Sequence, residues 1–101
     1  MREVGSRRKF PKRKVIAVDV DGTLIINGTA NSKLVSWIKK KKKMGFEIYI
    51  WSARGKAHAD FAVEFAKIEN DVDAVISKPF YIVDDLGWSW IRETEVVTEL
   101  R

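Results

Sequence analysis

The sequence contains no cysteine, so disulfide bonds and thiolate metal sites are excluded. This is compatible with a reducing compartment, and we expect the protein in the cytoplasm. No apolar run approaches the roughly 20 residues that a membrane-spanning helix needs. No signal-peptide pattern is visible in the sequence either. We therefore expect a protein without a membrane partner.

The positive charge of the chain is concentrated in its first residues. Residues 1–14 contain seven Lys and Arg residues against a single acid, Glu3, and the remainder is close to neutral. A length of 101 residues limits the chain to one domain, and its 46% apolar residues suffice for a small core. We interpret residues 1–14 as a basic arm and residues 15–101 as a single domain. The arm is either a solubilising tail or a segment that attracts an anionic partner such as nucleic acid.

The segment Val15–Leu24 organises the rest of the chain. Four apolar residues, Val15–Val18, lead directly into Asp19, Val20 and Asp21, which a glycine follows. A short apolar run before a turn is typical of a buried strand of an α/β sheet, and such strands carry ligands at their carboxyl ends. Asp19 and Asp21 are two residues apart, so both side chains face the same side of an extended backbone. Two carboxylates this close repel one another unless a cation lies beside them or one is protonated.

This segment has two other interpretations. A strand that ends in an ordinary Asp-Gly turn needs no function, and this alternative is open. A calcium-binding loop also uses Asp-x-Asp spacing, but it needs helical flanks and a glutamate near its end, which residues 19–30 lack. Asn27-Gly28, between β-forming residues, predicts a tight hairpin beside the acids. The hairpin either shields a site from water or is a plain surface turn.

The first expected helix begins after an N-cap at Asn31 or Ser32 and ends near Met44 and Gly45. Trp37 lies on its apolar stripe, which favours a position in the core. The end of the helix contains five consecutive lysines, residues 39–43, which suit the helix dipole. These lysines are either solvated or contact a phosphate-rich polymer.

A second helix is expected over about residues 56–70. Its apolar positions are expected to face the core, and they are Phe61, Ala62, Phe65, Ala66 and Ile68. His58, the single histidine, lies in the first turn of this helix. A solvent-facing position is favoured for it over a contact with substrate.

Polar side chains also follow three further apolar runs that we expect to be strands. Residues 46–51 lead into Ser52, with Arg54 two residues later; residues 73–77 lead into Lys78; residues 80–83 lead into Asp84 and Asp85. A hydroxyl and a guanidinium suit phosphoryl oxygens, and a lysine can neutralise an anionic group held near the acids. An ordinary loop or helix cap remains the alternative for Ser52 and for one of the two aspartates.

The alternation of strands and helices predicts an α/β fold with a parallel sheet. Right-handed crossovers then bring the carboxyl ends of the strands to one edge. Six polar residues are expected along that edge, namely Asp19, Asp21, Ser52, Lys78, Asp84 and Asp85. Trp88 and Trp90 are expected in the core or an interface, with substrate stacking as the alternative, and Ile91–Arg101 is open between helix and strand.

In these residues the chain resembles the haloacid dehalogenase-like (HAD) hydrolase superfamily. Four motifs of that superfamily occur in the right order: Asp19-Val20-Asp21-Gly22-Thr23-Leu24, Ser52 after an apolar strand, Lys78 before a proline, and the pair Asp84-Asp85. The resemblance covers about residues 15–85. It implies a Rossmann-like three-layer sandwich around a mainly parallel sheet. The gaps in which family members carry a cap domain are too short here, so it implies a HAD-like core without a cap domain.

The resemblance also implies a role for each matching residue. Asp19 would be the nucleophile that forms an aspartyl-phosphate, and Asp21 the general acid and base. Lys78 would screen the charge of the nucleophile, and it would hold the phosphoryl group together with Ser52, Ala53 and Arg54. Mg²⁺ would be bound by Asp19, Asp21 and either Asp84 or Asp85.

The expected function is thus that of a Mg²⁺-dependent phosphatase that hydrolyses phosphomonoesters. The open site, the basic residues and Arg54 point to nucleotides or nucleic-acid ends as substrates. One alternative is a non-catalytic module that binds phosphate or metal. Another is a nucleic-acid-binding protein for which the α/β core is only a scaffold.

Overall fold

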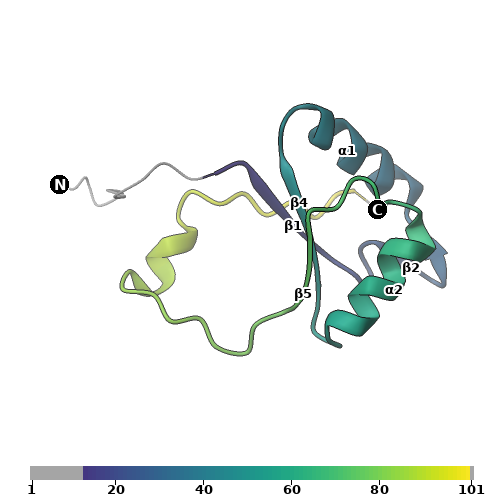
Figure 1. The fold of residues 1–101 in the computed structure, drawn as a ribbon. Coiled ribbons are helices and arrows are strands. Elements are labelled where there is room, and N and C mark those ends of the chain that lie inside the picture. Colours follow the sequence, from purple (N-terminus) through teal and green to yellow (C-terminus); the bar gives the residue numbers. More distant parts are fainter. Residues whose placement is uncertain (1–12, 101) are drawn as a thin grey trace.

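A three-stranded parallel sheet lies at the centre of the protein in the computed structural model, which describes residues 13–100 (Figure 1). The strands are β1 (Val15–Asp19), β4 (Glu47–Ser52) and β5 (Ala74–Ser77), in the order β1-β4-β5. The predicted α/β class, the parallel sheet and these three strands are confirmed, with bounds that differ by a residue or two. Residues 1–12, most of the expected basic arm, lie outside the described residues.

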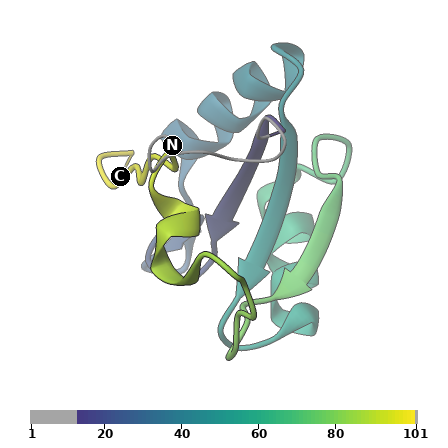
Figure 2. The same ribbon diagram turned by 90° about the vertical axis from the view of Figure 1, so that its left-hand side faces the viewer.

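Two helices connect the strands, α1 (Ser32–Lys43) and α2 (Lys56–Ala66). Both crossovers advance in the same direction along the sheet, so right-handed connections place both helices on one face. Figures 1 and 2 show α1 and α2 together on that face, with the segment after β5 on the other. This segment contains a short 3₁₀ helix, η2 (Gly87–Ile91). The described residues therefore form two regular layers instead of the expected three-layer sandwich.

The core lies between the sheet and the two helices. Its fully buried side chains include Val20 and Leu24 after β1, Ile38 of α1, and Ile48 and Ile50 of β4. Trp37 is partly buried and packs against this core, in agreement with its expected position. None of the helices within residues 13–100 combines the length and the apolar character that crossing a membrane requires.

Asn31 caps α1 as predicted and also ties three parts of the chain together. Its carboxamide oxygen accepts a hydrogen bond from the Leu34 amide at 3.3 Å. Its side-chain nitrogen donates to the carbonyl oxygens of Thr23, at 3.0 Å, and of Leu100. Asn31 is buried, so these bonds satisfy a polar group that would otherwise be costly to bury. The last described residue is thereby fixed beside the loop that follows β1.

The predicted hairpin is present between β2 (Ile25–Ile26) and β3 (Thr29–Ala30). Asn27 and Gly28, its two turn residues, have φ values of +52° and +75°. Positive φ at both central positions is the geometry of a type I′ turn, which Asn-Gly favours.

Helix α2 is shorter than predicted and packs through smaller residues. It ends at Ala66, and its buried residues are Ala59, Ala62, Val63 and Ala66. Ala62, Ala66 and Ile68 are buried as expected, but Phe61 and Phe65 are 54% and 42% exposed. The core prediction for these two phenylalanines is wrong because the alanine-rich stripe of the helix faces the sheet and leaves them on its flank.

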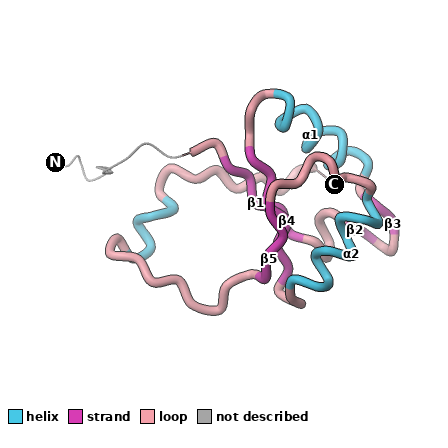
Figure 3. The backbone as a smooth tube through the Cα atoms, viewed as in Figure 1, coloured by secondary structure: helices cyan, strands magenta, loops and turns pink. Residues whose placement is uncertain are grey.

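The predicted fourth strand over residues 80–83 is also wrong. This segment is a loop in the structure (Figure 3), and Phe80 and Val83 are more than 90% exposed. Strand propensity expresses packing against neighbouring strands, and this segment has no strand partner among residues 13–100. The outer edge of β1 is consequently unpaired within the described sheet.

Candidate functional site

Polar side chains meet at the carboxyl edge of the sheet, as the topology predicts. Asp19 is the last residue of β1, Ser52 is the last residue of β4, and Lys78 follows β5 directly. The Lys78 ammonium lies 3.4 Å from Oδ1 of Asp19, although the two residues are 59 positions apart in the sequence. The Lys78 amide donates to the Ser52 carbonyl oxygen at 2.9 Å, which fixes the backbone of Lys78 against β4.

The turn after β1 holds the Asp19 carboxylate in place. Gly22 has a φ of +77°, a conformation that glycine adopts without steric cost. The turn returns the chain so that the Leu24 amide donates to the Asp19 carbonyl oxygen at 3.3 Å. The Thr23 hydroxyl donates to Oδ2 of Asp19, also at 3.3 Å. One Asp19 oxygen thus faces a hydroxyl and the other faces an ammonium group.

Asp21 is held by two cationic or potentially cationic side chains. Arg54 places Nη1 3.3 Å from Oδ1 of Asp21, and His58 places Nε2 3.2 Å from the same oxygen. His58 is only 19% exposed, so the expected solvent-facing position is wrong. Its ring stacks on Phe61, with 6.0 Å between the ring centroids. The first turn of α2 therefore carries His58 into the site.

Ser52 and Ala53 lie where the chain leaves β4. Ser52 is 1% exposed, and its hydroxyl oxygen accepts a hydrogen bond from the Arg54 amide at 3.0 Å. A hydroxyl can donate as well as accept, so this bond leaves the O–H of the buried Ser52 able to donate. Ala53 is exposed in the loop between Ser52 and Arg54.

Asp84 and Asp85 are not brought to this edge. The segment that contains them leads away from β5 and forms a wide loop before η2 (Figure 1). The Asp84 side chain is used inside this loop, where its Oδ1 accepts a hydrogen bond from the Leu86 amide at 2.8 Å. Among residues 13–100, no three His, Cys, Asp or Glu side chains are grouped so that they could share a metal ion. The expected meeting of all six polar residues is thus wrong for this pair, because the strand that would deliver it does not form.

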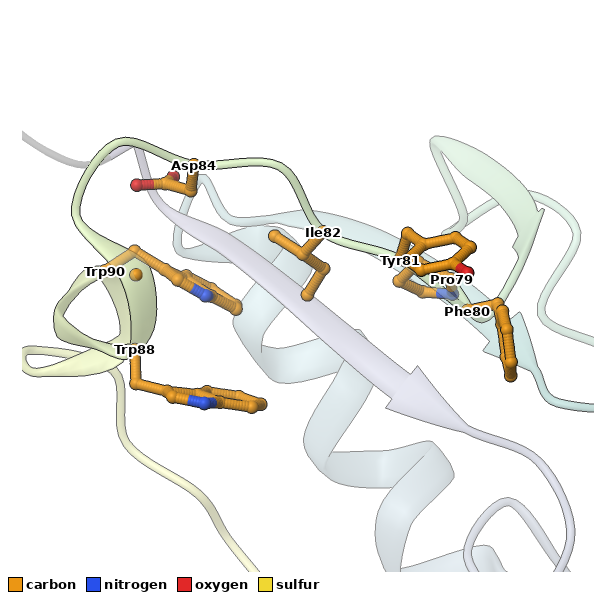
Figure 4. A pocket seen from close by; sticks show the side chains of 8 residues that line it. Pro79, Phe80, Tyr81, Ile82, Asp84, Trp88 and Trp90 are labelled. Carbon is orange, nitrogen blue, oxygen red and sulfur yellow. The ribbon is translucent and has the colours of Figure 1, made fainter.

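A pocket of about 350 Å³ lies elsewhere, under the segment after β5 (Figure 4). It is lined by Tyr81, Ile82, Asp84, Trp88 and Trp90 among others, and by no residue of β1 or β4. Trp88 is 79% exposed and so does not lie in the core, which leaves an interface or substrate stacking from the expected positions, while Trp90 is partly exposed. This pocket is separate from the Asp19 site.

The charges of the edge are arranged so that each carboxylate has a cationic neighbour. Lys78 faces Asp19, and Arg54 faces Asp21. Two nearby carboxylates were expected to need such compensation, and side chains provide it here. Asp19 and Lys78 are 35% and 41% exposed, so a ligand from solvent can reach both. The arrangement suits an anionic group that lies between Lys78 and Arg54.

Sequence reasoning missed part of this site. His58 is expected in solvent, although it lies in the first turn of α2, only four positions after Arg54 in the loop that leads into this helix. The sequence marks Thr23 only as part of the motif at residues 19–24. The turn at Gly22 brings its hydroxyl to Asp19. Trp51 was read as a strand residue, yet its ring lies 5.9 Å from the Lys78 ammonium. A cation held over an aromatic face in this way is restricted in its orientation.

Comparisons of the chain with protein-family models, with curated proteins and with solved structures found no match.

Proposed function

We propose that this protein is a phosphatase that hydrolyses phosphomonoesters through an aspartyl-phosphate on Asp19. The observation that carries the proposal is the contact of 3.4 Å between Asp19 and Lys78 at the carboxyl ends of β1 and β5. A carboxylate attacks an anionic phosphoryl group poorly unless a cation offsets their repulsion. The superfamily resemblance of residues 15–85 agrees with this assignment of roles. The proposed fold is accordingly a HAD-like core without a cap domain.

In the first step, an oxygen of Asp19 forms a bond to phosphorus while the bond between phosphorus and the leaving-group oxygen breaks. Asp21 carries the proton that the leaving oxygen needs. Lys78 and Arg54 offset the charge of the phosphoryl oxygens, and the Ser52 hydroxyl can donate to one of them. Most of the rate gain in such a transfer comes from positioning and electrostatic stabilisation.

In the second step, water attacks the phosphorus of the aspartyl-phosphate. Asp21, now deprotonated, takes a proton from this water, and the bond between phosphorus and the Asp19 oxygen breaks. Phosphate leaves and Asp19 is regenerated. The contacts of Arg54 and His58 hold the Asp21 carboxylate in one orientation for both proton transfers.

Mg²⁺ is the metal that this donor set suits, because it binds to one or two carboxylates together with phosphate oxygens and water. The Asp19 carboxylate and the backbone carbonyl of Asp21 would hold the ion, which would neutralise charge on the phosphoryl group. A third protein ligand, Asp84 or Asp85, is implied by the resemblance alone. The described position of these two residues does not support it.

The substrates that we propose are nucleotides or nucleic-acid ends. The acids of the site are exposed and no cap domain fits in the short connections of this chain, so a large phosphorylated molecule could approach. The Arg54 side chain is 66% exposed, so it is open to such a substrate while it stays beside Asp21.

The test is release of phosphate from an aryl phosphate, with and without Mg²⁺. Asp19→Asn is expected to lower the rate by at least about 10²-fold because it removes the nucleophile. Asp71→Asn is the matched control, since Asp71 is a carboxylate that pairs with Lys39 away from the site. Equal rates in the parent and in Asp19→Asn would refute the proposal.

A non-catalytic module that binds phosphate is the second candidate. It is favoured by one observation, namely that the described residues do not bring a third acid to Asp19 and Asp21. Such a module would accept phosphate on Asp19, or bind it, without turnover. Stable phosphorylation of Asp19 with no released phosphate would support this candidate over the phosphatase.

A further inference from the structure

A second charged surface lies at the opposite end of the sheet from Asp19. Lys14, just before β1, and Lys41 of α1 lie beside the rings of Trp37 and Phe46 there. Lys40 and Lys43 are exposed on the last turn of the same helix. Lys14 to Asp19 covers five residues, which is about 16 Å along a strand. We call this surface the lysine end and define it by Lys14, Lys40, Lys41 and Lys43 with the rings of Trp37 and Phe46.

The five consecutive lysines at the end of α1 divide into two groups. Lys39 and Lys42 bind Asp71 and Asp73, each at 2.7 Å. Lys14, Lys40, Lys41 and Lys43 form no ion pair with any acid among residues 13–100. Lys40 and Lys43 are exposed and three residues apart on the helix, so they are neighbours of like charge. The ion pairs of Lys39 and Lys42 connect α1 to the segment before β5, whereas the four lysines without an ion pair repel each other.

The aromatic rings hold two of these cations at fixed places. The Lys41 ammonium lies 5.4 Å from the Trp37 ring centroid and 5.1 Å from that of Phe46. Lys14 lies 5.6 Å from the Phe46 ring on the other side of the cluster. Contacts of this kind restrict long side chains and reduce the entropy that they lose when a ligand binds. The lysine end is therefore a partly preorganised set of cations that pair with no acid among residues 13–100, and the neighbouring Glu47 pairs with Arg13 instead.

We propose that the lysine end binds the phosphate backbone of nucleic acid, independently of base sequence. Several adjacent cations are complementary to a chain of phosphates, and neutralising them relieves their mutual repulsion. Ammonium groups act as point charges on phosphates and read no base. The sequence contains five more Lys and Arg residues among residues 2–12.

The rings of the cluster argue against an anionic membrane as the partner. A membrane-binding surface inserts aromatic and aliphatic side chains beside its cations. Trp37 and Phe46 pack against the core and lie under ammonium groups, so they are not free for insertion. A membrane is accordingly an outcome of the test and not the proposal.

The experiment measures binding of the full chain to a fluorescent single-stranded oligonucleotide between 50 and 200 mM salt. The variant is Lys40→Gln/Lys41→Gln/Lys43→Gln, which keeps good helix formers on α1. Removal of three phosphate contacts should reduce the slope of log K against log salt by about 2, and affinity at low salt by at least ~10-fold. Thermal unfolding of the variant shows whether it is folded.

The matched control is Lys33→Gln/Lys56→Gln/Lys67→Asn, which removes the same charge elsewhere on the surface. Asparagine suits Lys67, whose φ is +60°. The control should keep most of the affinity and the salt slope. If the two triple variants lose the same affinity for the oligonucleotide, the net charge of the protein and not the lysine end determines binding. That result would overturn the proposal. Binding to anionic vesicles without binding to the oligonucleotide would overturn it as well.

The triple variant Lys40→Gln/Lys41→Gln/Lys43→Gln should release phosphate from an aryl phosphate as the parent does, because its three lysines lie at the other end of the sheet from Asp19. Loss of phosphatase activity and loss of nucleic-acid binding therefore report on separate surfaces. A failure of either proposal leaves the other standing.

Discussion

At the scale of single residues, His58 is the side chain whose observed position differs most from the expected one. It is a plain surface residue in the sequence, but it lies 3.2 Å from Asp21 and against the ring of Phe61. His58 acts through its contact with Asp21. We therefore assign it the role of a positioning residue that fixes the Asp21 carboxylate.

This role predicts a difference between two substitutions of His58. His58→Gln keeps a side-chain nitrogen that can donate to Asp21, whereas His58→Leu removes the donor. We expect His58→Leu to lower kcat by about 10-fold with little change in KM, and His58→Gln to keep most of kcat. Steady-state kinetics on an aryl phosphate measures both. Equal losses in the two variants would indicate a packing role only.

At the scale of elements, the strands and helices with strong local signals were predictable. The apolar runs of β1, β4 and β5, the Asn-Gly hairpin and the Asn31 cap each rest on neighbouring residues, and each is present. Residues 80–83 have the same apolar character, yet they form a loop. A strand exists only with a hydrogen-bonded neighbour, and the sequence of the segment alone does not contain that neighbour.

The same reason limits the predicted site. Asp19, Asp21, Ser52 and Lys78 follow elements that form, so the topology brings them to one edge. Asp84 and Asp85 depended on the strand that does not form. The positions of Phe61 and Phe65 could not be predicted either, since helix periodicity does not show that small alanines would face the sheet.

Asp73 links elements in a way that predicts a pH-dependent stability. Its Oδ2 accepts a hydrogen bond from the buried Ile48 amide at 2.8 Å, and both of its oxygens contact Lys42 at 2.7 Å. The bond from Lys42 and the bond from the Ile48 amide hold the pKa of Asp73 below its usual value of 3.8. The ionised form is therefore favoured by folding, and its contribution is complete above that value and is lost as the pH falls through the lower pKa of the folded state.

We expect Asp73→Ala to lower the free energy of unfolding at pH 7 by about 1–3 kcal/mol, because the Ile48 amide loses its acceptor. Asp73→Asn keeps an acceptor and should cost less. The difference in free energy of unfolding between the parent and Asp73→Asn should shrink in acid, because protonation of Asp73 removes the same charge from the parent. Urea unfolding at pH 7 and near pH 3 measures this, with Asp71→Asn as a control for a surface ion pair. A deficit of Asp73→Asn that is independent of pH would contradict the assignment.

At the scale of the whole molecule, two different charged sites lie at opposite ends of the sheet. The carboxylates Asp19 and Asp21 lie at the carboxyl ends of the strands, and the lysine end lies at their amino ends. A parallel sheet produces this separation because all its strands point the same way. One end is suited to chemistry on a phosphate, and the other to holding a chain of phosphates.

The open face of the sheet is the other feature of the whole molecule. The segment after β5 crosses it with exposed apolar residues, of which Phe80, Tyr81 and Val83 are each more than 80% exposed. Among residues 13–100, the outer edge of β1 also has no neighbouring strand. The strands position Asp19, Asp21, Ser52 and Lys78, and the exposed apolar residues of this segment do not.

The account as a whole depends on a covalent phosphoryl group on Asp19, and trapping that group is its most direct test. Borohydride reduces an acyl phosphate to an alcohol, so reduction during turnover should convert the side chain at position 19 to that of homoserine. We predict that peptide mass spectrometry finds this change at position 19 only when substrate and Mg²⁺ are both present, and not in Asp19→Asn. Steady turnover with no modification at position 19, or with modification at another acid, would contradict the account.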